Sequence, residues 1–145
     1  LYGMVPGGGA IEIAMSRELE KERNKTKGMA AYGIDCVISA LKRPLAQIVY
    51  NSGHNPLEKV EEVMYTQTEK GIASIGINCD NGELADMMEL GVLDPARVKS
   101  YALKAAGEVS EAILRINTII KKRDDVSAGQ KTVQESPMGI SEMDF

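Results

Sequence analysis

The stretch Met4-Val-Pro-Gly-Gly-Gly-Ala-Ile-Glu-Ile13 places three consecutive glycines directly before the apolar periodicity of a helix. Glycine has no side chain, so a ligand can approach its backbone closely, and a helix N-terminus presents unpaired N–H groups to an anion. The stretch lacks both the GxGxxG spacing of a dinucleotide-binding loop and the Lys-Ser/Thr of a phosphate-binding loop. Taken alone, Gly7, Gly8 and Gly9 therefore fit a flexible entry to a helix as well as they fit a ligand-contacting turn.

Helical periodicity dominates the sequence downstream of the glycines. The spacing of apolar residues predicts helices over 10–24 and 27–41, and a further helix that begins at Asn55-Pro56 and ends at Gly71. We interpret Pro44 as the first-turn residue of a separate short helix that ends at 51–53, because a missing N–H costs nothing at that position.

The periodicity changes once, in the middle of the chain. Residues 74–79 predict a strand, Asp80-Asn81-Gly82 is a hairpin turn signal, and residues 83–85 predict a short return strand. Asp94-Pro95 then begins a long helix that reaches about Arg123, with Asp94 as its N-cap, and this helix is expected to be the central spine of the domain. The sequence therefore predicts a mainly α fold with one small β-hairpin and a long central helix.

Composition excludes several classes of function. Aromatic residues make up only 4% of the 145 residues and the net charge is −4, so neither a base-stacking platform nor a basic nucleic-acid surface is expected. No apolar run approaches the roughly 20 residues that a membrane span requires. Cys36 and Cys79 lack the spacing of a zinc site or a disulfide and are expected to be free thiols in a reducing cytoplasm.

Seven short segments occur in the order in which they are found in chaperonin subunits. They are Val5-Pro-Gly-Gly-Gly-Ala-Ile-Glu12, Ala40-Leu-Lys-Arg-Pro-Leu-Ala-Gln-Ile-Val49, Asn51-Ser-Gly53, Gly76-Ile-Asn-Cys-Asp-Asn-Gly82 with Asp86-Met87, Gly91-Val-Leu-Asp-Pro95, Arg97-Val-Lys99 and Ala112-Ile-Leu-Arg-Ile116. Over residues 3–123 the chain resembles the C-terminal part of the equatorial domain of a chaperonin. The mixture of segments is more similar to the thermosome-like bacterial type, often called group III, than to the GroEL type.

The resemblance implies a division of the chain and a set of nucleotide contacts. Residues 1–126 would belong to the equatorial domain, and residues 127–145 would form a flexible C-terminal tail. Gly8, flanked by Gly7 and Gly9, would lie against the nucleotide, and Asp94 would bond the ribose hydroxyls. The hairpin residues Asn78, Cys79 and Asp80 would contact the adenine end, although Asn78 and Asp80 beside Gly82 are by default turn formers.

The resemblance also implies which parts of the machine lie outside this chain. The cofactor would be ATP or ADP with Mg, and the phosphate loop, the metal ligand and the catalytic Asp would come from the N-terminal half. The complete protein would then be a cytoplasmic ATPase whose identical or homologous subunits form a double ring, and clients would bind an apical domain that is absent here. The 145-residue chain alone should neither hydrolyse ATP nor bind it tightly.

Two other functions remain open on the residues alone. The chain could be a stand-alone helical scaffold or oligomerisation module without a nucleotide role. A dinucleotide-binding enzyme is a weaker alternative, because that fold needs a parallel sheet and the sequence offers too few strands.

Overall fold

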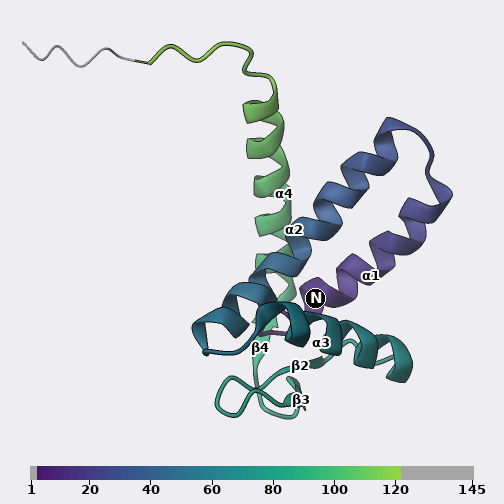
Figure 1. The fold of residues 1–145 in the computed structure, drawn as a ribbon, viewed down its shortest axis with the longest axis vertical. Coiled ribbons are helices and arrows are strands. Elements are labelled where there is room, and N and C mark those ends of the chain that lie inside the picture. The colour runs from purple at the N-terminus through teal and green to yellow at the C-terminus, as the bar shows by residue number, and fades with distance from the viewer. Residues whose placement is uncertain (1–2, 122–145) are drawn as a thin grey trace, which may run out of the picture.

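A computed structural model describes residues 3–121, and this part of the chain is mainly helical. The predicted fold class is confirmed (Figure 1). The elements in chain order are β1 (Met4–Pro6), α1 (Ala10–Lys25), α2 (Met29–Asn51), α3 (Pro56–Lys70), β2 (Ile75–Ile77), β3 (Leu84–Asp86), β4 (Leu93–Pro95) and α4 (Ala96–Leu114). The predicted tail, 127–145, lies outside the described residues.

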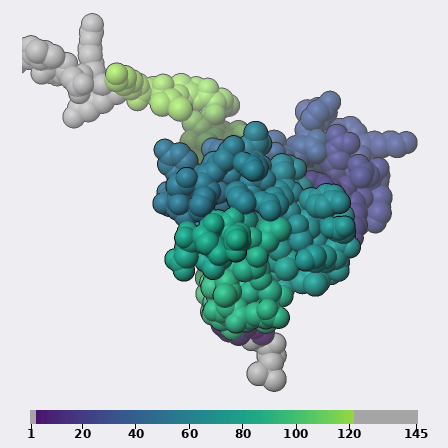
Figure 2. Space-filling model, turned by 60° about the horizontal axis from the view of Figure 1, so that its bottom comes forward, coloured from purple at the N-terminus to yellow at the C-terminus, as the bar shows by residue number. Residues whose placement is uncertain are grey.

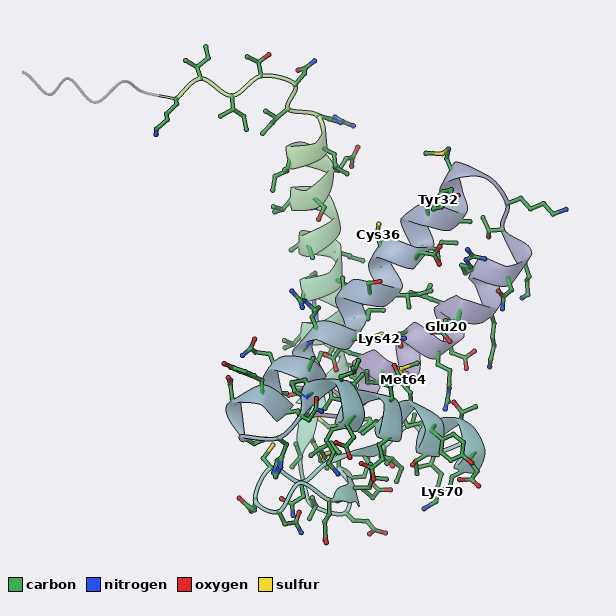
Figure 3. The ribbon with its side chains drawn as sticks, in the orientation of Figure 1. Glu20, Tyr32, Cys36, Lys42, Met64 and Lys70 are labelled. Carbon is green, nitrogen blue, oxygen red and sulfur yellow. The ribbon has the colours of Figure 1, made fainter. Side chains whose placement is uncertain are left out.

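Helices α1 and α2 run side by side as a long antiparallel pair, and α3 crosses beneath one end of it (Figure 1). Ion pairs join α1 to α2: Lys42 lies 3.4 Å from Glu20 (Figure 3), and Arg23 lies 2.9 Å from Asp35. The core lies where α1, α2, α3 and β2 meet and consists of Ile13, Leu45, Val49, Val60, Val63 and Ile77. This core fixes the start of α1, and therefore the position of the glycine triplet.

Helix α2 corrects the interpretation of Pro44. Residues 29–51 form one continuous helix with Pro44 in its interior, so no new helix begins there. An interior proline removes one helical hydrogen bond and costs about 3 kcal/mol. Leu41, Leu45 and Val49 are buried on one face across this point, and their packing keeps the helix continuous despite that local cost.

The described residues, 3–121, form two small antiparallel sheets where the sequence predicts one hairpin. The predicted hairpin is present as β2 and β3, which pair from Ile75 with Asp86 to Ile77 with Leu84. The second sheet joins β1 to β4, and its two strands lie far apart in the sequence. Strands of three residues separated by most of the chain leave no local periodicity to detect.

Helix α4 is present, but its predicted end and its predicted burial are wrong. It ends at Leu114 instead of Arg123, and no α4 residue is buried among the described residues. In Figure 2 the yellow-green end of the described chain projects away from the other helices. Residues 115–120 include three isoleucines, an asparagine and a threonine, which are weaker helix formers than alanine, and no packing compensates.

Helix α3 begins and ends where the sequence predicts. Asn55 Oδ1 accepts a hydrogen bond from the Leu57 N–H at 3.1 Å, and Gly71 ends the helix with a left-handed φ of 67°.

Among residues 3–121, no helix is both long enough and apolar enough to span a bilayer.

Candidate functional site

The pairing of β1 with β4 brings the glycine triplet against Asp94. Val5 lies opposite Asp94 in the ladder, and the Gly7 N–H donates to the Val92 carbonyl at 2.9 Å. A Cβ atom built on Gly7 would lie 3.1 Å from Asp94 Oδ2. The two segments that the sequence singles out are therefore in direct contact.

The three glycines of the triplet have different surroundings. Gly7 and Gly9 are buried, whereas Gly8 is only partly buried. Gly8 has a φ of 62°, a conformation that L side chains rarely adopt. Gly8 is thus the member of the triplet whose backbone a ligand can reach most easily.

Asp94 is not the N-cap of α4, which corrects the sequence-based interpretation. The N-cap is Pro95, and no side chain caps the helix. Strand pairing holds Asp94 in an extended conformation, and the Ala96 N–H instead donates to the Gly3 carbonyl at 3.0 Å. The Asp94 carboxylate is free of the capping role and its side chain is 38% exposed.

Lys99 binds the Asp94 carboxylate. Its Nζ lies 2.8 Å from Asp94 Oδ2 and 2.6 Å from Glu12 Oε1, so one ammonium joins α4 to β4 and to the first turn of α1. Burial alone would lower the pKa of Lys99, but the hydrogen bonds to Asp94 and Glu12 and the charges of both carboxylates outweigh it and raise the pKa. Lys99 therefore carries its positive charge at neutral pH.

Sequence reasoning did not assign a role to Lys99 or Glu12. Glu12 and Lys99 are 87 positions apart, so no spacing rule joins them. The available signal was weak. Both residues lie in segments that resemble chaperonins, and each is within five positions of the glycines or of Asp94.

The tip of the β2–β3 hairpin is shaped by local hydrogen bonds, and its Gly82 lies close against His54, since a Cβ built on Gly82 would be 2.5 Å from His54 Cε1. The Asp80 N–H donates to Asn78 Oδ1 at 3.0 Å, the Asn78 N–H donates to the Glu83 carbonyl at 2.8 Å, and Cys79 is an exposed free thiol. Among residues 3–121, no hydrogen bond or ion pair joins Asn78, Cys79 or Asp80 to the triplet or to Asp94. The hairpin tip is therefore a turn that is not bonded to the other predicted site residues.

The base of the hairpin does reach the triplet, through Met87. This residue is 2% exposed, and its sulfur lies 3.2 Å from a Cβ built on Gly8 and 3.1 Å from one built on Gly76. Met87 thus packs against a glycine of the triplet and a glycine of β2 at the same time. The packing of Met87 therefore fixes the distance between the base of the hairpin and Gly8.

An apolar cavity of 410 Å³ lies next to the Lys99 ion pairs, between α1, α2 and α4. Its wall includes Glu12 and Lys99, and otherwise is formed mainly by Met15, Val37, Ala40, Leu41, Pro44, Ala102, Leu103 and Ala106. The polar site therefore borders an apolar groove along α4.

The chemistry of the site suits hydroxyl groups better than it suits a metal ion. Within residues 3–121 no three His, Cys, Asp or Glu side chains gather closely enough to hold a metal. The site offers one partly exposed carboxylate, a bare glycine backbone and one ammonium that the carboxylates already engage. A carboxylate of this kind accepts hydrogen bonds from hydroxyl donors such as those of a sugar.

The comparison with known proteins agrees across sequence and structure. The TCP-1/cpn60 chaperonin family matches residues 2–124. A thermosome subunit of Pyrococcus abyssi is 39% identical over 132 residues, and the match covers 91% of this chain and 22% of that protein. Thermosome subunit alpha of Thermoplasma acidophilum is 35% identical over 133 residues, covering 92% of this chain and 23% of that protein.

Two solved structures have the same fold. The crystal structure of a group III chaperonin in the open state is 42% identical, with a TM-score of 0.78, and the match covers 81% of this chain and 24% of that one. The open-state monomer of a group II chaperonin from Methanococcoides burtonii is 34% identical, with a TM-score of 0.73, and covers 78% and 28% respectively. The chain spans about a quarter of the length of these relatives, and it belongs to the TCP-1/cpn60 chaperonin family.

Proposed function

We propose that this chain is the C-terminal part of the equatorial domain of an ATP-dependent chaperonin of the group III type, where it supplies one side of the nucleotide pocket and part of the ring contacts. The observation that carries the proposal is the contact between the glycine triplet and Asp94, since β1–β4 pairing puts Gly7 against Asp94 Oδ2. The 42% identity to a group III chaperonin supports the type.

In this proposal each predicted site residue contacts a different part of the nucleotide. Gly8, the partly exposed glycine, would let the nucleotide lie directly against the backbone. Asp94 would accept hydrogen bonds from the ribose hydroxyls. Asn78, Cys79 and Asp80 are proposed for the adenine end, which requires the nucleotide to extend from Asp94 toward the hairpin tip.

The remainder of the pocket would come from outside this chain. Bound Mg would neutralise the phosphate charge, and its ligands and the phosphate loop belong to the rest of the protein in this proposal. The residues described here fit that division, because they offer a hydroxyl acceptor and a bare backbone but no metal-binding cluster within residues 3–121. In this proposal these residues bind and orient the nucleotide.

We place the complete protein in the cytoplasm, as a double ring of identical or homologous subunits that encloses unfolded clients. The exposed apolar side chains of α4, including Val98, Val109 and Ile113, support contacts with further protein. Thermosome subunits are the relatives from which this assembly is inferred.

The test is nucleotide binding by the complete natural protein that contains this sequence. Replacing Asp94→Ala removes charge-assisted hydrogen bonds worth about 1.5–3 kcal/mol, so ATP should bind about 10- to 100-fold more weakly. Glu108→Ala, which removes an exposed carboxylate from α4, is the matched control and should leave the dissociation constant unchanged.

The same experiment separates the proposal from the scaffold alternative. A helical scaffold or oligomerisation module needs no nucleotide, and the exposed apolar face of α4 is the observation that favours it. If Asp94→Ala lowers thermal stability but leaves ATP affinity unchanged, the nucleotide role is wrong and the scaffold function stands.

A further inference from the structure

Glu12, Lys99 and Asp94 form a network of three charged residues at the candidate site. Lys99 Nζ lies between Glu12 Oε1 at 2.6 Å and Asp94 Oδ2 at 2.8 Å. The three side chains come from α1, which begins directly after the glycine triplet, from α4, and from β4, whose Asp94 lies against Gly7. One lysine therefore connects the helix that follows the glycines to the carboxylate that lies against them.

Exposure increases along this network from Glu12 to Asp94. The Glu12 side chain is 9% exposed, that of Lys99 is 25% exposed and that of Asp94 is 38% exposed. Within residues 3–121 the buried Glu12 Oε2 has no hydrogen-bond partner. A buried carboxylate is costly unless it is paired, so Glu12 holds Lys99 firmly and only Asp94 faces the site.

The position of Lys99 constrains one oxygen of Asp94. Lys99 binds Oδ2, and this is also the oxygen next to Gly7. A carboxylate has about four lone-pair directions. With Lys99 holding Oδ2, the remaining lone pairs of Asp94 can still accept hydrogen bonds, and their directions are fixed. Without the lysine the carboxylate can rotate about its side-chain bonds, and two acidic groups would share the site without a cation between them.

We infer that Lys99 is a positioning residue that acts through Asp94 and sets the preference of the site for a nucleotide with an intact ribose diol. This inference rests on the proposed function, because it assumes that Asp94 bonds the ribose. Lys99 itself does not contact the nucleotide. Its effect is therefore on discrimination between sugars more than on the phosphate contacts.

The experiment measures dissociation constants for ATP, 2′-deoxy-ATP and 3′-deoxy-ATP in the complete protein. The wild type should bind ATP about 10-fold more tightly than either deoxy analogue, as expected for one hydrogen bond to a charged group. Lys99→Met should reduce this ratio to about 1–2. Lys99→Arg, which keeps the charge and the donors, should restore most of it, and Lys104→Met, on the exposed part of the same helix, should leave it unchanged.

Glu12→Gln is a second variant in case Lys99→Met fails to fold. This substitution weakens the contact of Lys99 with its buried partner and keeps both Asp94 and Lys99. The ratio of the affinities for ATP and its deoxy analogues should therefore fall about 2- to 3-fold. A change in stability alone, with the ratio intact in every folded variant, would show that the network is only structural and would overturn the inference.

Failure of the inference and failure of the proposed function have different signatures. If Asp94→Ala abolishes the preference for ATP while Lys99→Met and Glu12→Gln preserve it, the nucleotide role stands and the positioning role is wrong. If the wild type shows no preference, or if Asp94→Ala leaves the preference unchanged, both are wrong.

Discussion

Gly9 lies directly against Leu45 of helix α2. A Cβ atom built on Gly9 would be 2.8 Å from the Leu45 Cβ and 2.9 Å from its Cα, closer than non-bonded carbon atoms approach. Gly9 also has a left-handed φ of 84°. The third glycine of the triplet is therefore required by the packing of α1 against α2, whereas Gly8 is partly exposed and a Cβ built on it would lie closest to the side chains of Met87 and Val92.

Replacing Gly9→Ala should destabilise the protein by about 2–5 kcal/mol. The left-handed backbone contributes about 1–2 kcal/mol of this, and forcing a methyl group against the α2 backbone contributes about 1–3 kcal/mol. The measurement is chemical denaturation followed by helical circular dichroism.

Gly33→Ala is the control for the Gly9 substitution. Gly33 lies inside α2, is exposed and has no atom within 4 Å of a built Cβ. Alanine should therefore stabilise that helix by about 0.5–1 kcal/mol. Equal effects of the two substitutions would contradict the close packing of Gly9.

Gln67 is a second structural determinant of the site. It is fully buried, and its Nε2 donates to the carbonyls of Ala10 at 3.1 Å, Ala73 at 3.3 Å and Ile75 at 2.8 Å. The amide thus joins the start of α1 to β2. Gln67→Leu should cost about 1–3 kcal/mol, because the hydrogen bonds are lost and carbonyl groups remain buried.

The control for this substitution is Gln47→Leu. Gln47 is exposed and donates to Asn51 on the surface of α2, so its loss should change the free energy of unfolding by less than about 0.5 kcal/mol. If Gln67→Leu proves as neutral as Gln47→Leu, the amide is not what holds α1 against β2.

Asp86 should make the β2–β3 hairpin sensitive to acid. A hydrogen bond from Ser74 at 2.6 Å lowers the pKa of Asp86 from 3.8; burial opposes this, and the backbone N–H groups of Met88 and Glu89 add to it. Because the folded pKa lies below the unfolded one, the stabilisation is present above pH 3.8 and is lost as the pH falls through the folded pKa.

The prediction for Asp86 is checked by denaturation between pH 2 and pH 6, roughly the window in which carboxylates titrate. Asp86→Asn should lose less stability than the wild type as the pH falls below about 4, and Ser74→Ala should show a smaller change in the same direction. Parallel pH profiles for all three proteins would mean that the hydrogen bonds to Asp86 add nothing to stability.

The accuracy of the sequence-based prediction depended on how local each signal was. Helices α1 and α3 and the β2–β3 hairpin were predicted because caps, turn residues and apolar periodicity lie within the element itself. Pro44 was misinterpreted because its local preference opposes a continuous helix, and only the burial of Leu41, Leu45 and Val49 outweighs it. Helix α4 was predicted too long because periodicity does not reveal whether an apolar face is covered.

The candidate site was predicted in part for the same reason. Gly7, Gly8, Gly9 and Asp94 were identified from short motifs, and in the structure Gly7 lies against the Asp94 carboxylate. The nucleotide roles of these residues and of Asn78, Cys79 and Asp80 remain predictions. Asp94 was expected to cap a helix, and strand pairing with Val5 prevents that.

The sequence by itself determined the helical class, the hairpin and the two segments that meet at the site, because these depend on residues that are neighbours along the chain. Only the tertiary structure decided that Gly9 is needed for packing, that Gly8 is the accessible glycine, and that Lys99 joins Glu12 to Asp94. Those relationships join residues separated by up to 87 positions. They arise when burial of the core and pairing of β1 with β4 bring distant side chains within hydrogen-bond distance, and no local preference of the chain encodes that meeting.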